Sequence, residues 1–129
     1  MGQQQLLLIV LGVIIVGIAV VVGINLFNAN ATNANRDGVI SDLNNLGAMA
    51  QQFYKKPTSM GGGGNNFTGN GNTWAIPTGL DSTANGTYGA TVNADDVVII
   101  GIGTEPGDGG VVQATATVSA TAINVLVNN

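Results

Sequence analysis

Residues 6–27 read LLLIVLGVIIVGIAVVVGINLF, a long apolar stretch near the start of the chain. It contains no charged residue and a single amide, Asn25. As an α-helix that rises about 1.5 Å per residue, it is about 33 Å long, which matches the hydrocarbon core of a bilayer. The stretch therefore predicts a helix that can span a membrane.

Two ordinary explanations of such a stretch fit its flanks poorly. A secretory signal peptide begins with cationic residues and has a shorter apolar run, whereas the first basic residue here is Arg36. A single-pass anchor normally carries Lys or Arg at its cytoplasmic end, and this N-terminus has only uncharged residues before the apolar run. The flanks indicate a role for the segment beyond spanning the bilayer.

Small residues interrupt the aliphatic background at Gly12, Gly17, Ala19 and Gly23. Small side chains let two helices approach closely, and close van der Waals contact is a main source of helix association in lipid. We therefore expect these four positions to pack against other copies of the chain. The alternative is that glycine is simply common in transmembrane helices.

The helical pattern continues beyond the apolar stretch. Apolar residues recur at helical spacing on one face of the polar segment that follows, and the chain has no proline before Pro57. A single helix of roughly fifty residues, about 75 Å long, accounts for both segments. The apolar stripe of its amphipathic second half is expected to pack on a sheet through Val39, Ile40, Leu43, Leu46, Ala50 and Phe53.

The segment after the helix, residues 57–84, is rich in Gly, Asn, Thr and Pro, which is typical of a surface loop. Its four consecutive glycines are followed by no Gly-Lys-Ser/Thr sequence, so phosphate binding is not favoured. Trp74 and Ile76 are expected to hold the far end of the loop against the core.

The last part of the chain predicts β-structure. Four short segments rich in Val, Ile and Thr, at 87–93, 96–104, 110–119 and 122–127, are separated by short turns, which favours an antiparallel meander. The predicted fold is therefore α+β, a long N-terminal α-helix packed on an antiparallel sheet of three or four strands. The expected division is an apolar half-helix at 1–27 and a globular head at 28–129, comprising an amphipathic half-helix (28–56), a glycine-rich loop (57–84) and the sheet (85–129).

The charge and the residue inventory narrow the possible functions. The 129-residue chain has three basic and seven acidic residues and a formal net charge of -4, so nucleic acid is not an expected partner. It has no Cys and no His, which excludes thiolate and imidazole metal sites, Cys nucleophiles and imidazole bases. We expect no catalytic, cofactor-binding or metal site.

A long helix with an apolar first half and an amphipathic second half, followed by a glycine-rich loop and an antiparallel sheet, resembles the type IV pilins and their relatives. In sequence, the likeness is concentrated between Gly2 and Asn28, where polar residues are followed at once by an aliphatic run. The resemblance implies a subunit that the cytoplasmic membrane holds until extraction, when the apolar helices bundle inside an extracellular, cell-surface filament. Its implied partners are identical subunits, a prepilin peptidase and the pilus assembly machinery.

Three features depart from the common pilin pattern. Many pilins carry a glutamate near the start of the apolar run, where this chain has Gln3, Gln4 and Gln5 and no carboxylate before Asp37. We expect these glutamines to set the subunit register by bonding to neighbouring backbones instead of forming an ion pair. The chain also lacks a proline in the apolar half and a disulfide in the last loop. These departures indicate a divergent bacterial branch, an archaeal-type pilin or a secretion-system pseudopilin.

The mature N-terminus has two candidates. The leader of the pilin family ends in a glycine directly before the mature chain, so Gly2 fits that role and Gln3 would then come first. Alternatively, the chain is mature from Met1. The absence of charge before Arg36 favours a basic leader that is already removed, since membrane orientation normally needs one.

A bound calcium ion is a further possibility that the resemblance to secretion-system relatives raises. Its ligands would be acidic residues of predicted loops, Asp95, Asp96, Glu105 and Asp108. Acidic residues are common in turns, however, and this spacing matches no dedicated calcium loop.

Three Asn-X-Thr sequences fit the acceptor pattern for N-linked glycans. They are Asn30-Ala31-Thr32, Asn66-Phe67-Thr68 and Asn85-Gly86-Thr87. A chain this rich in Asn and Thr also yields such matches by chance.

Two functions of other classes compete with a filament subunit. A membrane-tethered extracytoplasmic binding module would use the sheet or the glycine-rich loop to bind a partner. An enzyme without His or Cys would need paired carboxylates, and Asp95 and Asp96 point to opposite faces if they lie in a strand. Catalysis is therefore the weakest of the three hypotheses.

Overall fold

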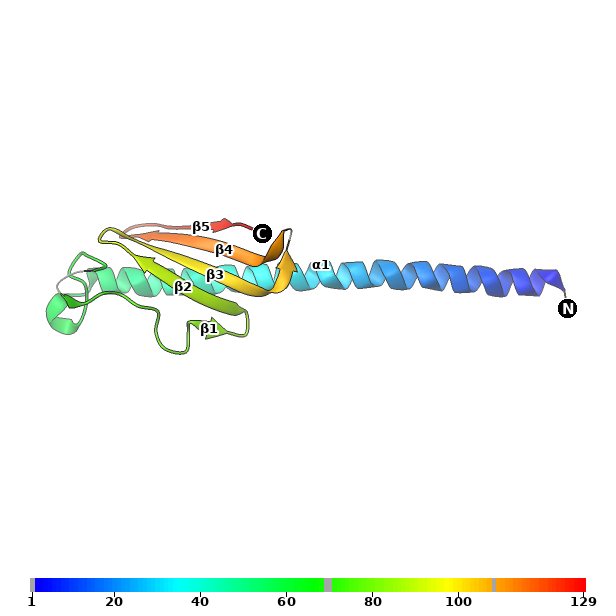
Figure 1. Cartoon of the computed structure of the whole chain (residues 1–129), viewed down its shortest axis with the longest axis horizontal. Helices are drawn as coiled ribbons and strands as arrows, with labels where there is room; N and C mark the ends of the chain where they lie inside the picture. Colours follow the sequence, from blue (N-terminus) through cyan, green and yellow to red (C-terminus); the bar gives the residue numbers. More distant parts are fainter. Residues whose placement is uncertain (1, 69–70, 108) are drawn as a thin grey trace.

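The computed structural model describes residues 2–68, 71–107 and 109–129. One helix, α1 (Gln3–Lys55), runs through 53 residues, and a five-stranded sheet lies along its C-terminal half (Figure 1). The N-terminal half of α1 extends beyond the sheet as a straight rod (Figure 1). The prediction of a single helix across the apolar and the polar segment is confirmed.

The C-terminal end of α1 follows from its sequence. Lys56 has an extended backbone (φ -76°, ψ 135°), and its N–H donates to the carbonyl oxygens of Gln52 (3.0 Å) and Phe53 (3.2 Å). Pro57 disfavours a helical conformation for the residue before it, so the helix stops there. A short 3-10 helix, η1 (Thr58–Met60), and the glycine-rich loop then lead to the sheet.

The sheet is an antiparallel meander in which each strand pairs with the next one along the chain. Its strands are β1 (Ser82–Thr83), β2 (Gly86–Val92), β3 (Asp96–Gly107), β4 (Gly110–Ser119) and β5 (Ile123–Val127). The four predicted strands and the α+β fold are confirmed. The sheet has five strands because Ser82 and Thr83 pair with Thr87 and Gly86 across a tight turn. Two residues are too few to show a strand period in the sequence.

The core lies between α1 and the inner face of the sheet. Alternate residues of β3 and β4 face the helix and are completely buried, namely Val97, Ile99, Val112, Ala114, Ala116 and Val118. Gly47 lies where α1 comes close to β4 and β5, because a Cβ there would lie 3.0 Å from Ile123 Cδ1 and 3.1 Å from Val118 Cγ2. A small residue at this position lets the helix lie directly on the sheet.

The residues of α1 that were predicted to pack on the sheet do not all do so. Val39, Leu43, Leu46 and Ala50 are buried in the core, and Phe53 is half-buried against it. The prediction for Ile40 was wrong. This residue is half-buried and does not belong to the hydrophobic core of the described residues. Ile40 lies about 100° around the helix from the buried Val39, and this places it outside the buried stripe of α1.

Aromatic residues fasten the glycine-rich loop to the head. Trp74 is buried, as expected, and Ile76 is half-buried against the core. Phe67, which the sequence did not single out, is completely buried, and its ring centroid lies 4.8 Å from that of Tyr54 near the end of α1. The loop is therefore packed on the head at two places.

Candidate assembly surface

The apolar half of α1 has no covering from the described part of its own chain. Every large apolar side chain from Leu6 to Phe27 keeps between 52% and 78% of its surface exposed. An 18-residue window of α1 has a mean hydropathy of 3.3, and none of that window is buried. The helix is thus long and apolar enough to cross a membrane.

The glycines of this half have no explanation within the described chain. A Cβ built on Gly12, Gly17 or Gly23 meets no atom within 4 Å. Glycine inside a helix costs about 1 kcal/mol relative to alanine. These glycines weaken the helix, although within the described part of the chain there is room for a larger side chain at each position.

The small residues lie on two faces of the helix. At about 100° per residue, Gly12, Ala19 and Gly23 fall within an arc of about 40°, whereas Gly17 lies about 140° away from Gly12. All four point into open space, because this part of the helix is uncovered. The helix therefore offers two separate places for close approach.

The three glutamines occupy the first turn of α1. The helix starts after Gly2, which has an extended backbone and no side-chain cap, and its first turn contains no acidic residue. Gln3 lies beside Leu6, Leu7 and Val10 in a shallow, open hollow on the helix surface. All three glutamines are exposed, and their side chains make no hydrogen bond to another described residue.

At the other end of the apolar half, Asn35 joins the helix to the sheet. It is a buried polar residue of α1, with 8% of its surface exposed. Its Oδ1 accepts hydrogen bonds from the backbone N–H groups of Thr104 (3.0 Å) and Glu105 (3.2 Å). Its Nδ2 donates to the backbone oxygen of Asn85 (2.7 Å) and lies 3.3 Å from Thr104 Oγ1. One side chain thus holds two segments of the sheet region.

An irregularity in β3 explains why this asparagine is needed. The register between β3 and β4 shifts between Ile102 and Pro106. Such a bulge disrupts the ladder and leaves backbone groups unpaired, and buried N–H groups require a partner. Gly103 makes the room, because a Cβ there would lie 2.1 Å from Asn35 Oδ1.

Two neighbours of Asn35 on α1 extend this attachment. Thr32 Oγ1 donates to the backbone oxygen of Pro106 (2.8 Å) and also lies 3.0 Å from the oxygen of Asn28. Arg36 Nε donates to the backbone oxygen of Asn129 (3.2 Å). We call Thr32, Asn35 and Arg36 the neck residues, because they fix the helix to the head just after its apolar half ends.

A second polar cluster surrounds the carboxylate of Asp42 on α1. Its Oδ2 accepts hydrogen bonds from the hydroxyls of Tyr88 (2.5 Å) and Thr83 (2.9 Å) and from Asn85 Nδ2 (3.1 Å). Burial acts to raise the pKa of Asp42, and the three hydrogen bonds outweigh it, so the pKa lies below its usual value. Burial and the adjacent carboxylate raise the pKa of Tyr88. The cluster ties α1 to β1 and β2.

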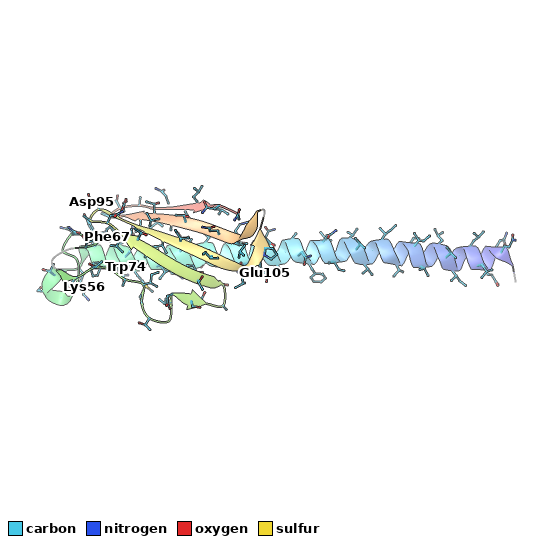
Figure 2. All side chains as sticks on the ribbon, in the orientation of Figure 1. Lys56, Phe67, Trp74, Asp95 and Glu105 are labelled. Carbon is cyan, nitrogen blue, oxygen red and sulfur yellow. The ribbon has the colours of Figure 1, made fainter. Side chains whose placement is uncertain are left out.

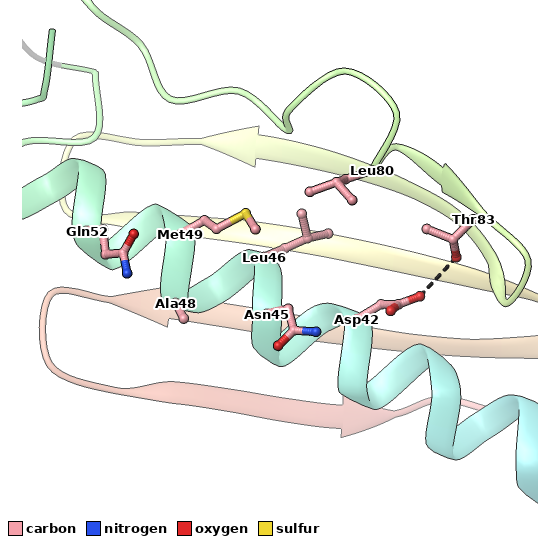
Figure 3. Close-up of a pocket in the computed structure, with 8 residues that line it drawn as sticks. All are labelled: Asp42, Asn45, Leu46, Ala48, Met49, Gln52, Leu80 and Thr83. Atoms are coloured by element: carbon pink, nitrogen blue, oxygen red, sulfur yellow. Dashed lines mark hydrogen bonds between the residues drawn. The ribbon is translucent and has the colours of Figure 1, made fainter.

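A groove of about 330 Å³ runs beside this cluster between α1 and the segment that leads into β1. Its lining residues are Asp42, Asn45, Leu46, Ala48, Met49, Gln52, Leu80 and Thr83, and Figure 3 shows the hydrogen bond from Thr83 to Asp42 at its edge. The one carboxylate among these lining residues, that of Asp42, accepts its three hydrogen bonds through Oδ2.

Of the acidic residues considered for calcium, Asp95 and Glu105 lie far from each other, at opposite ends of the head (Figure 2). Asp96 begins β3 and accepts a hydrogen bond from Asn93 Nδ2 (2.7 Å). Asp108 and Met1 lie outside the described residues. Within the described ranges, no group of three or more acidic residues is placed to hold a metal ion.

The sequence contains a signal for Asn35, which was not among the predicted site residues. Asn35 lies four residues before Val39 and eight before Leu43, so it continues the buried stripe of α1 toward the apolar half. A polar residue on a buried stripe indicates a hydrogen-bonded role. No comparable signal marked Asp42, whose partners come from the distant β1–β2 region.

No protein-family model matches this chain, and no curated protein and no solved structure matches it either.

Proposed function

We propose that this chain is a structural subunit of an extracellular, type IV pilus-like helical filament and that the cytoplasmic membrane holds it before assembly. One observation carries the proposal: in a single unbroken helix, one half is uncovered and the other half is fixed to a folded head. In this proposal the apolar half is the assembly surface, and the head faces outward from the filament.

Water is not a stable surrounding for the apolar half. Burial of one Val, Leu or Ile side chain contributes about 1.5–3 kcal/mol. The segment from Leu6 to Phe27 exposes such residues at most of its positions. Lipid or other copies of the same segment must therefore cover it. In the proposal, the membrane covers it first and the filament bundle covers it afterwards.

The glycines favour a covering of protein over lipid alone. Alanine at Gly12, Gly17 and Gly23 would stabilise the helix, and no described atom of the chain stands in its way. Glycine at these positions would let a neighbouring helix approach the backbone of α1 closely. Their division between two faces also fits a filament, because head-to-tail assembly uses two different surfaces of each subunit.

The neck residues favour a filament over a tethered binding module. Their hydrogen bonds hold the end of β3 and the backbone of Asn129 on α1, so that helix and head form one unit. A head that is fixed to its helix takes the same position in every subunit, as a helical repeat requires. A tethered module would work equally well on a flexible neck.

Microscopy of material sheared from the surface of the producing cells tests the proposal. We expect filaments in which mass spectrometry identifies this chain as the main protein. Suppose instead that the chain stays in the membrane fraction and that mild detergent releases it as a monomer. The proposal would then fail, and the membrane-tethered binding module would take its place.

A further inference from the structure

We infer that Asn66 carries an N-linked glycan on the surface of the head. The chain has three Asn-X-Thr sequences, which begin at Asn30, Asn66 and Asn85. Such a sequence is an acceptor where it lies on a surface segment of an exported protein, and the fold places the three motifs differently. The inference rests on the head lying outside the cytoplasm, as in the proposed function.

At Asn66 the hydroxyl and the amide are in contact. Thr68 Oγ1 donates to Asn66 Oδ1 (3.0 Å), and the backbone N–H of Thr68 donates to the same oxygen (2.8 Å). Both hydrogen bonds are accepted by Oδ1, so Nδ2 takes no part in the contact with Thr68. Within the described part of the chain, this Nδ2 makes no side-chain hydrogen bond, and it is not a buried unsatisfied atom.

Phe67 holds this motif in place. Its side chain is completely buried, its N–H donates to the oxygen of Ala94 (3.0 Å), and its oxygen accepts from the N–H of Trp74 (2.9 Å). With the middle residue anchored in the core, Thr68 is exposed and Asn66 is half-buried at the surface. Figure 2 places Phe67 in the part of the head that lies away from the apolar half-helix. A glycan at this place would leave the assembly surface open.

The motif at Asn85 is occupied by contacts of the fold. Asn85 Nδ2 donates to Asp42 Oδ2 (3.1 Å), so its amide nitrogen is part of the Asp42 cluster. A Cβ on Gly38 would lie only 2.6 Å from Asn85 Oδ1, which shows how closely α1 approaches this side chain. A sugar on Nδ2 would break the hydrogen bond and need the space that the helix fills.

The motif at Asn30 lies within α1. Asn30 is exposed, but residues two apart in a helix do not face each other, so the hydroxyl of Thr32 lies away from the Asn30 amide. That hydroxyl donates to the backbone oxygen of Pro106 at the neck. Of the three motifs, Asn66 thus combines an accessible amide with a hydroxyl in contact with it.

The modification is the transfer of an oligosaccharide from a lipid-linked sugar pyrophosphate. Asn66 Nδ2 forms a bond to the anomeric carbon of the first sugar, and the bond from that carbon to the pyrophosphate oxygen breaks. The pyrophosphate leaves with the electron pair, and Nδ2 gives up one of its two protons to a base. No oxidant or reductant is needed.

Mass spectrometry of peptides from the chain, isolated from the cells that produce it, tests the inference. We expect the peptide that contains Asn66 to carry a sugar mass and to yield aspartate at 66 after enzymatic removal of the glycan. Asn66→Gln and Thr68→Ala should abolish the sugar mass. Thr68→Ser, which keeps the hydroxyl, and the matched control Asn30→Gln should retain it.

An unmodified Asn66 in the wild-type chain would overturn the inference, and so would a glycan at Asn30 or Asn85. The wild-type result stands without any variant, so a variant that misfolds does not affect it. Filament formation is scored separately by microscopy. Filaments without the sugar would reject this inference alone, whereas a modified chain without filaments would reject only the proposed function.

Discussion

The two halves of α1 belong to one unbroken helix and differ in everything that surrounds them. In the C-terminal half, Val39, Leu43 and Ala50 are completely buried against the sheet. In the N-terminal half, the large apolar side chains are at least half exposed from Leu6 to Phe27. The apolar residues of the C-terminal half form the core of the head. Those of the N-terminal half take no part in that core.

Glycine shows the same difference in another way. At Gly47 and Gly103 in the head, a Cβ would lie 3.0 Å from Ile123 and 2.1 Å from Asn35. At Gly12 in the apolar half, a Cβ would meet no described atom within 4 Å. The head glycines are explained by contacts within the chain. The glycine of the apolar half has no such explanation among the described residues, and this contrast can be tested.

Removal of the apolar half should produce the largest effect. We expect a chain that begins at Asn28 to lose filament formation completely and to fold as a monomeric head, because the buried residues of α1 from Val39 onward remain. Microscopy and size-exclusion chromatography measure the two outcomes. A shortened head that aggregates or is unfolded would show that the two halves do not have separate roles.

Gly17→Leu should sharply reduce the yield of filaments and leave the head intact. The added side chain keeps a neighbouring helix at a distance, whereas within the described chain a Cβ at this position meets nothing within 4 Å. The filament yield and the thermal midpoint of unfolding measure the two effects. Val22→Leu is the matched control, since it ends in the same side chain and lies about 140° from Gly17 around the helix. Equal filament yields from both variants would show that a small residue at position 17 is not needed for assembly.

Asn35→Ala should destabilise the head by about 1–3 kcal/mol, because part-buried backbone N–H groups lose their hydrogen-bond partner. The N–H groups of Thr104 and Glu105 lose their partner in this variant. Denaturant unfolding measures the change in free energy. Asn44→Ala at an exposed position of α1 is the control and should change stability by less than about 0.5 kcal/mol. Similar values for both variants would show that Asn35 does not hold the neck.

The smallest effect concerns the pH dependence of stability through Asp42. Its pKa is lower in the folded head than usual, so the charged form contributes stability above its unfolded pKa of about 3.9, and this contribution is lost as the pH falls through the folded pKa. Unfolding curves of wild type and Asp42→Asn over the acid range measure it. We expect the wild-type free energy of unfolding to fall more steeply with acid. Parallel curves would contradict the role of the three hydrogen bonds.

Much of this fold could be predicted because it depends on local patterns. The long helix follows from apolar periodicity and the absence of proline before Pro57, and the four longer strands follow from runs of Val, Ile and Thr between turns. The assembly positions Gly12, Gly17, Ala19 and Gly23 were also named from local composition, and they remain a prediction. Helices and strands can be predicted from local patterns because the spacing of apolar residues in each element marks the face that is buried.

The polar contacts that fix the head could not be predicted in this way. Asn35 and Thr104 are 69 residues apart in the chain, and Asp42 and Tyr88 are 46 apart. The need for Asn35 arises from the bulge in β3, which becomes visible only when β3 pairs with β4. The two-residue β1 likewise depends on the turn that precedes β2. These features belong to the assembled head and have no local sequence pattern.

A helical reconstruction of the filament tests most directly whether the two halves of α1 have separate roles. We predict continuous α-helical density from Gln3 to Lys55, with Gly12, Gly17 and Gly23 at the closest approaches between neighbouring helices. An unwound backbone in a dry core would leave several N–H and C=O groups unpaired, which costs more than the glycines do. Extended, non-helical density across Gly12 to Gly23, or neighbouring helices that approach each other elsewhere, would contradict the account.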